Sequence, residues 1–466
     1  MSHPEHSPDD QPDDDPLSAI FGGQVPPEMR EALESMGLTN LDPAMVRQMQ
    51  AQVQAMMSTS DDSAIHEDLA RDTARGVVAQ QGDTSLSDRT RSDVEQVVQV
   101  ATLWLDAVTD FPPPQGRGTA LSRAEWVEQT LPLWRTLTTP VAEGVRAALT
   151  SAMQQQLKDL GEGDMPVEIP GLPPGVNPAA VMGQMEPMMR RMSGAMFGAQ
   201  VGQAVGTLAG EIVSGTEVGL PLMPDETVAM LPSNVAAFAE GLEVDAGEVH
   251  LYLAVREAAR VRLFAGVPWL GPQLLTAVQD YARDIRIDTE AIEQAVRSAD
   301  PSDPEAMQQA LSGSMFSPEP SPAQQSALSR LETYLALVEG WVDVVSERAS
   351  SAHLPHAAAL SEAVRRRRAT GGPAEKVFAS LVGLELRPRR LRDAANLWSA
   401  LESAHGSHAR DEAWAHPDVA PTAADLDDPL GFVDRRSAAA SSETSLDDEL
   451  EALLRDEGEA GPSGRA

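Results

Sequence analysis

The chain contains no cysteine among its 466 residues. This absence excludes disulfide bonds, thiolate nucleophiles, cysteine-held iron–sulfur clusters and cysteine-ligated zinc, but it leaves metal sites built from histidine and carboxylate open. The sequence also has no apolar run of the roughly 18 residues that a membrane-spanning helix needs. We therefore predict no integral membrane segment.

Basic residues are scarce, with 35 Lys and Arg against 71 Asp and Glu, which gives a formal net charge of -36. A charge of this sign repels nucleic acids and anionic membrane surfaces on average, so we expect no nucleic-acid partner. Residues 1–16 contain several acidic side chains and neither Lys nor Arg, which is the opposite of a signal peptide. We expect the protein to be cytoplasmic.

Composition divides the chain into four regions. Residues 1–40 are acidic and rich in Pro and Asp, so they are predicted to be disordered. Residues 41–64 read as a marginal helix followed by a linker, and residues 436–466 read as an acidic, disordered tail. Helical patterns recur throughout residues 65–435, which we predict to form one predominantly α-helical domain with little sheet.

Two stretches bear on how these helices are built. A helix is expected to begin at Ser122, where Glu125 completes a capping box, and two more helices are expected to follow before about residue 160. Glycine recurs at every fourth position from Gly194 to Gly210, and such a stripe lets another backbone approach closely. Polar residues interrupt that stripe, so we predict a tightly packed soluble helix. Residues 228–238 are compatible with a strand or a helix.

Two arginines and a glutamate fall within a strongly apolar helical pattern at residues 249–264. Arg256 and Arg260 are one helical turn apart, with Glu257 beside them. This is the spacing of H-E-x-x-H, in which two histidines bind zinc and the glutamate activates the metal-bound water. Arginine keeps its proton and offers no lone pair to a metal. The residues by themselves therefore indicate either a structural ion cluster or an anion site.

Four consecutive arginines form a second candidate: Arg365, Arg366, Arg367 and Arg368. They precede Gly371, Gly372 and Pro373 and a predicted helix, and a glycine-rich turn into a helix N-terminus is typical of an anion or phosphate site. In the alternative interpretation, the arginines stabilise the end of one helix and the glycines form the turn to the next.

The sequence from Arg256 through Leu263 to Leu270 resembles the zincin motif region of an actinobacterial family that is described as zinc-dependent metallopeptidases or hydrolases of unknown function. The resemblance covers roughly residues 65–435. Further motifs that carry it are Trp104-Leu105-Asp106, Ser122 to Trp126, Gly219 to Leu222, Glu339-Gly340-Trp341 and, most strongly, the stretch from Arg365 to Arg392.

The resemblance implies a zincin-like fold, mostly helical with a small sheet. It places Arg256 and Arg260 at the zinc-binding positions and Glu257 at the position of the general base. In zincins whose third ligand is a glutamate, that residue commonly lies in an E-x-x-x-D pattern. Glu339 and Asp343 have this form, so they are candidates for the third-ligand position and for the carboxylate behind it.

The replaced ligands favour a non-catalytic binding or scaffolding protein that needs no metal and has a protein or peptide partner. One alternative is an active zinc-dependent metallopeptidase or hydrolase that uses Glu257 as base and holds zinc in a non-standard site. Another is a site for a phosphorylated or carboxylated small molecule at Arg256 and Arg260. No histidine pair elsewhere in the sequence is evident as a replacement for the lost ligands.

Overall fold

A computed structural model describes residues 63–161, 178–283, 321–369, 377–379, 381 and 390–438. Several expectations therefore lie outside the described residues. These are the disordered start, the marginal helix, the tail from residue 439 and the turn at Gly371 to Pro373.

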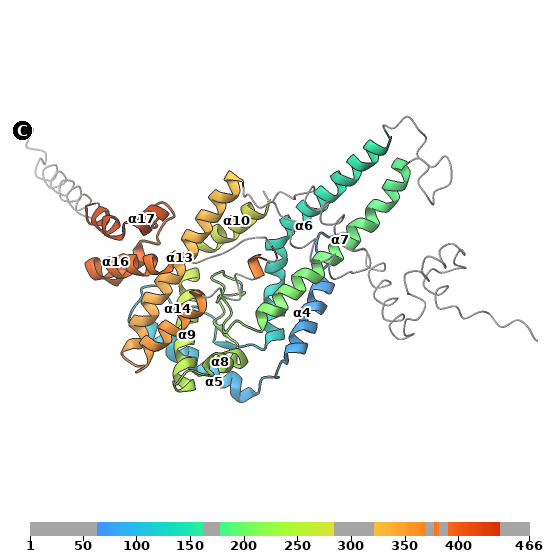
Figure 1. The fold of residues 1–466 in the computed structure, drawn as a ribbon. Coiled ribbons are helices and arrows are strands. Elements are labelled where there is room, and N and C mark those ends of the chain that lie inside the picture. Colours follow the sequence, from blue (N-terminus) through green and yellow to red (C-terminus); the bar gives the residue numbers. More distant parts are fainter. Residues whose placement is uncertain are drawn as a thin grey trace, which may run out of the picture. The chain divides into compact units, whose positions relative to one another are not determined.

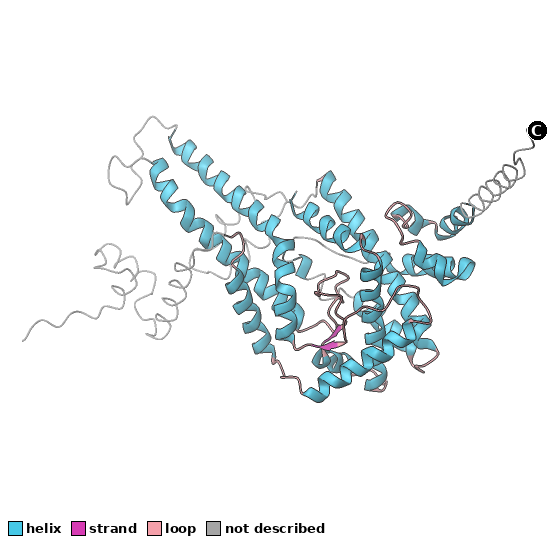
Figure 2. Ribbon diagram, turned by 180° about the vertical axis from the view of Figure 1, so that it is seen from behind, coloured by secondary structure: helices cyan, strands magenta, loops and turns pink. Residues whose placement is uncertain are grey.

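The described residues are mostly helical with a very small sheet, which confirms the predicted fold class (Figure 1 and Figure 2). A further helix begins at residue 429, and its described part runs to residue 438. The other elements are α4 (Glu67–Gln81), α5 (Asp88–Leu105), β1 (Thr119–Ala120), α6 (Arg123–Gly161), α7 (Pro178–Ala209), β2 (Ala229–Met230), α8 (Pro232–Ala239), α9 (Ala246–Gly266), α10 (Leu270–Arg283), α13 (Pro322–Ser351), α14 (Ala357–Ala369), α16 (Leu391–Glu412) and α17 (Ala423–Asp427).

The chain divides into two compact units. The first comprises Met1–Ser63, Leu157–Ala195 and Asp288–Met315, and its described residues are mainly the end of α6 and the beginning of α7. The second unit contains both strands and all of the predicted site residues, and it comprises Ala64–Gln156, Met196–Ile287 and Phe316–Ala466.

Helix α13 forms the centre of the second unit. It begins with a capping box, in which the Ser321 side chain accepts from the Gln324 backbone and the Gln324 side chain accepts from the Ser321 backbone. Helices α9, α10, α14 and α16 all pack against α13. Because neighbours surround it, every residue from Leu335 to Ser346 is buried, polar residues included. Charged side chains in this stretch therefore need partners from the surrounding helices.

The sheet consists of β1 and β2, which run parallel with Thr119 opposite Ala229. Ser214 forms an antiparallel bridge to Met230, so the loop after α7 lies along β2. The segment predicted as strand or helix contains both, because β2 is followed at once by α8, which begins at Pro232. These contacts position residues 213–217, the loop along β2.

The glycine stripe of α7 packs against α4, as its spacing predicts. A Cβ atom built on Gly198 would lie 2.5 Å from the backbone oxygen of His66, and one on Gly206 would lie 2.8 Å from that of Ala74. The two backbones are therefore too close for any side chain at these positions. None of the helices within the described ranges combines the length and the hydropathy needed to cross a membrane.

The expected breaks between residues 122 and 160 are wrong, because α6 is one continuous helix that contains Pro132 and Pro140. The capping box at its start is present, since the Ser122 backbone donates to Glu125 and the Glu125 backbone donates to the Ser122 hydroxyl. A proline removes one hydrogen bond and crowds the preceding turn. The helix nevertheless continues, because buried side chains on both sides of the prolines pack against the core and offset the lost hydrogen bonds. These side chains are Leu131, Trp134, Leu137, Val141 and Val145.

Candidate functional site

Helix α9 carries charged side chains into the core. Its start is capped by Asp245, whose side chain accepts hydrogen bonds from the backbones of Gly247 and Glu248. From Tyr252 to Leu263 every residue is buried, including Arg256, Glu257 and Arg260. The apolar pattern of the sequence therefore predicted the helix correctly, and the charged residues within it are as buried as their apolar neighbours.

Helix α13 supplies the carboxylates that pair with these arginines. Arg256 Nη1 lies 3.0 Å from Asp343 Oδ1, and its Nη2 lies 3.3 Å from Glu339 Oε2. Arg260 Nε donates to Glu339 Oε1 at 3.0 Å. Glu339 and Asp343 are themselves 1% exposed. The E-x-x-x-D pattern thus faces R-E-A-A-R across the interface between α9 and α13.

Helix α14 adds further cations to the same cluster. Arg365 donates to Asp343 Oδ2 from Nε at 3.0 Å and from Nη2 at 2.6 Å. Arg368 Nη1 lies 3.0 Å from Glu339 Oε2. The four consecutive arginines do not act together, because they project from different sides of α14.

The other two arginines of α14 have different surroundings. Arg366 is at the surface, where its side chain is 77% exposed and pairs with Glu362 one turn earlier. Arg367 Nη2 lies 3.5 Å from Glu217 Oε1, and its guanidinium lies over the Phe238 ring, 5.3 Å from the centroid.

Glu257 is 0% exposed, and both of its carboxylate oxygens accept hydrogen bonds. Oε1 accepts from the Thr216 backbone at 2.8 Å. Oε2 accepts from Ser214 Oγ at 2.7 Å, Thr216 Oγ1 at 2.9 Å and Arg260 Nη1 at 2.8 Å. The carboxylate is therefore enclosed by the loop along β2 on one side and by Arg260 on the other.

The two buried glutamates differ in how readily they ionise. Burial raises the pKa of Glu257, although Arg260 and the hydrogen bonds from Ser214 and Thr216 oppose that shift. Burial also acts against ionisation of Glu339, but its three arginine neighbours outweigh burial and hold its pKa at about 2. Glu339 is thus a permanently charged partner at neutral pH.

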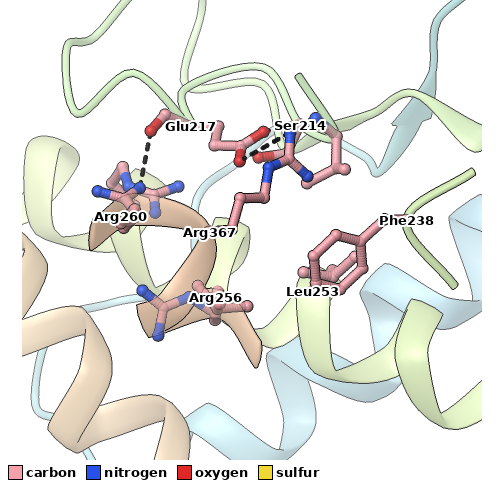
Figure 3. A pocket seen from close by; sticks show the side chains of 10 residues that line it. Ser214, Glu217, Phe238, Leu253, Arg256, Arg260 and Arg367 are labelled. Carbon is pink, nitrogen blue, oxygen red and sulfur yellow. Dashed lines mark hydrogen bonds and ion pairs between the residues drawn. The ribbon is translucent and has the colours of Figure 1, made fainter. Parts of the chain in front are cut away.

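A small pocket lies beside the cluster, between α9, α14 and the loop along β2 (Figure 3). Its volume is about 20 Å³. A single water needs roughly 10–15 Å³ by the same measure, so the pocket has room for one small species and excludes a peptide. Among the residues that line it are Ser214, Glu217, Arg256, Arg260, Arg367 and Arg368.

The residues at this site do not fit a zinc ion. Arg256 and Arg260, which have the spacing of the two histidines in H-E-x-x-H, carry guanidinium groups, and these have no lone pair to donate. Within the described ranges, no set of three or more His, Asp or Glu side chains is placed to hold a metal. Glu339 and Asp343 instead bind arginines.

The sequence does not indicate which loop residues lie at this site. Ser214, Thr216 and Glu217 are close together in the sequence, but Ser214 is 43 residues and Thr216 is 41 residues from Glu257. The only available signal was three oxygen-bearing side chains within a short segment, S-G-T-E, and such segments are common in surface loops. Only the pairing of this loop with β2 brings it to the site.

Comparison with known proteins identifies the family. A model of the zincin-like metallopeptidase family matches residues 65–433. A crystal structure from Chloroflexus aurantiacus, of a protein described as a "putative hydrolase with a novel fold", has a TM-score of 0.54 and covers 80% of this chain and 99% of its own. It is 16% identical to this chain, so the likeness shows the fold alone. No curated protein matches the sequence. The family match over most of the chain shows that this protein belongs to the zincin-like metallopeptidases.

Proposed function

We propose that this protein is a non-catalytic member of the zincin-like metallopeptidase family and acts as a binding or scaffolding protein towards a protein or peptide partner. The observation that carries the proposal is the pairing of Arg256 and Arg260 with Glu339 and Asp343. The arginines stand at the positions where the family motif has its histidines.

The guanidinium groups supply the positive charge that buried carboxylates require. An unpaired carboxylate inside a protein is strongly disfavoured, and a metal ion is one way to compensate it. Here Arg256, Arg260 and Arg368 compensate Glu339, while Arg256 and Arg365 compensate Asp343. These contacts join α9, α13 and α14, so the guanidinium groups supply positive charge that a metal could otherwise supply.

The surroundings of Glu257 argue against a role as general base. Such a base must reach a water or a substrate proton within hydrogen-bond distance. Both oxygens of Glu257 instead accept hydrogen bonds from Ser214, Thr216 and Arg260, and its side chain has no exposed surface. A pocket of about 20 Å³ also leaves no room for a scissile peptide bond. The retained glutamate is thus explained by its structural contacts.

A peptidase assay with a matched pair of variants tests the proposal. Full-length protein, Glu257→Gln and Glu248→Gln are incubated with a peptide library in the presence of added zinc. Glu248 lies in the first turn of the same helix and contacts His356, away from the cluster. We expect no hydrolysis above background from any of the three, and a change of stability in Glu257→Gln alone. Hydrolysis by the wild type and by Glu248→Gln that Glu257→Gln abolishes would establish the active-enzyme alternative.

A further inference from the structure

We propose that the pocket between α9 and α14 binds one monatomic anion of the size of chloride. The inference rests on the proposed function, because it requires arginines at the two positions that zinc ligands occupy in the family motif. The inference names a ligand class for the site. That class is the halide ions, and the side chains that line the pocket bind them.

The first support is the arrangement of charge around the pocket. Four of the lining residues are arginines: Arg256 and Arg260 from α9, and Arg367 and Arg368 from α14. Glu217 contributes the single carboxylate of the lining. The other carboxylates of the cluster, on Glu257, Glu339 and Asp343, do not line the pocket. The charges that line the pocket are therefore mainly positive, and they attract an anion.

The second support is the composition of the walls. Apolar residues complete the pocket, namely Val213, Phe238, Leu253 and Val364. Figure 3 shows Arg256 and Arg260 on one side and Phe238 with Leu253 on the other. Apolar walls lower the local dielectric, so the attraction between an anion and the guanidinium groups is stronger here than at an open surface.

The third support is the state of Arg368. Its burial, together with the nearby charges of Arg260 and Arg256, lowers its pKa, and Glu339 and Glu217 do not fully offset this effect. The direction of this shift shows that burial and the neighbouring arginines make the charged form of Arg368 less favourable. A bound anion would offset part of that cost.

The volume restricts the class of anion. About 20 Å³ holds one species close to the size of a water molecule. Phosphate, sulfate and a carboxylate group each bring several heavy atoms, which this volume does not accept without movement of the arginines. A guanidinium has five N–H donors, and the hydrogen bonds of Arg260 to Glu257 and Glu339 use three of them, so donors remain for a monatomic acceptor.

Thermal unfolding at constant ionic strength provides the first test. Full-length protein is melted in mixtures of sodium chloride and sodium gluconate, and bromide is used as a second halide. We expect the melting temperature to rise saturably with chloride by roughly 2 °C, and bromide to reproduce the rise, because an anion that binds only the folded state stabilises it by mass action. Equal melting temperatures in chloride and gluconate would overturn the inference, as would stabilisation by phosphate without stabilisation by chloride.

Two neighbouring arginines provide the matched variants. Arg367→Gln removes a cation that lines the pocket, whereas Arg366→Gln removes one that is 77% exposed on the same helix. We expect Arg367→Gln to weaken the apparent affinity for chloride by about tenfold, which corresponds to about 1.4 kcal/mol, because the variant loses one cation of the lining. Arg366→Gln is expected to leave the affinity unchanged. Equal chloride responses in the two variants would contradict the assignment of the site.

Chloride-35 line broadening in the nuclear magnetic resonance spectrum gives a readout that is independent of stability. We expect wild-type protein and Arg366→Gln to broaden the chloride line, and bromide to compete. Absence of protein-dependent broadening would overturn the inference. That outcome is distinct from failure of the proposed function, which would show as bound zinc or as hydrolysis that depends on Glu257.

Discussion

Arg260 Nε lies 3.0 Å from Glu339 Oε1, although the two residues are 79 positions apart in the sequence. The contact joins the R-E-A-A-R turn of α9 to the E-x-x-x-D turn of α13. We propose that these two turns occupy the place of a zinc site, and in this protein an ion pair joins them. Glu339 also contacts Arg256 and Arg368, so it is the point at which three helices meet.

Removal of the Glu339 charge is expected to destabilise the fold strongly. Glu339→Gln leaves buried arginines without their shared carboxylate, and loss of one partner from a buried ion pair costs about 3–5 kcal/mol. Glu347→Gln on the same helix is the control, since Glu347 is 54% exposed and lies 3.7 Å from Arg365. Surface pairs of this kind contribute about 0–1 kcal/mol. Urea unfolding measures both values, and equal losses would show that the cluster does not hold the fold.

Replacement of both arginines by histidine is expected to create a zinc site. In the double variant Arg256→His/Arg260→His, two imidazoles one turn apart would face Glu339, which contacts both arginines in the wild type. The buried carboxylates would also gain a cation in place of the lost guanidinium groups. Calorimetry is expected to show uptake of about one zinc ion, and a further Glu339→Gln change is expected to weaken it. A folded double variant that takes up no zinc would show that histidines at positions 256 and 260, together with Glu339, do not have the geometry of a zinc site.

The glycine stripe predicts opposite effects of alanine in two packed helices. A Cβ atom on Gly202 would overlap the backbone oxygen of Ala70, so Gly202→Ala should destabilise the protein by about 1–3 kcal/mol. Gly76 lies within α4, and a methyl group added there would have no other atom within 4 Å, so Gly76→Ala should stabilise the protein by about 0.5–1 kcal/mol. Thermal unfolding tests both. No loss at Gly202 would contradict the close approach of α4 and α7, and a loss at Gly76 would contradict the open space around that residue.

The stability of the protein should depend on His250 below neutral pH. Burial lowers the pKa of His250, and Asp93 opposes this only in part. The folded state therefore binds its proton less readily than the unfolded state, whose pKa is about 6.5. The contribution of neutral His250 is complete above that value and is lost as the pH falls below it.

Chemical unfolding between pH 7.5 and pH 5.5 measures this effect. We expect the free energy of unfolding to fall less steeply in His250→Gln than in the wild type, because the variant has no imidazole to protonate. His405→Gln, at an exposed position, is the matched control for the substitution. Parallel pH profiles for wild type and His250→Gln would contradict the assignment.

Local patterns were sufficient to predict most helices and parts of the site. The apolar periodicity around Arg256 indicated α9, and the capping box at Ser122 indicated the start of α6. The spacing of Glu339 and Asp343 suggested a shared role, and both side chains do face Arg256. These signals are visible in the sequence because helical geometry relates residues that are three or four positions apart.

Long-range contacts were not predictable in the same way. Nothing near Glu257 in the sequence indicates that Ser214 and Thr216 hold its carboxylate, because a two-residue strand brings them there. Nor does the run of arginines in α14 show which of them join the cluster, since that depends on how the helix is rotated against α13. The separate helices expected before residue 160 are one helix, α6, in which buried side chains flank Pro132 and Pro140.

The metal content of the full-length protein tests the central claim most directly. Plasma mass spectrometry is performed on protein purified without a metal-binding tag, with circular dichroism to show that the same sample is folded. Because Arg256 and Arg260 pair with Glu339 and Asp343, we predict far less than one zinc ion per folded chain. Near-stoichiometric zinc in folded wild-type protein would contradict the account.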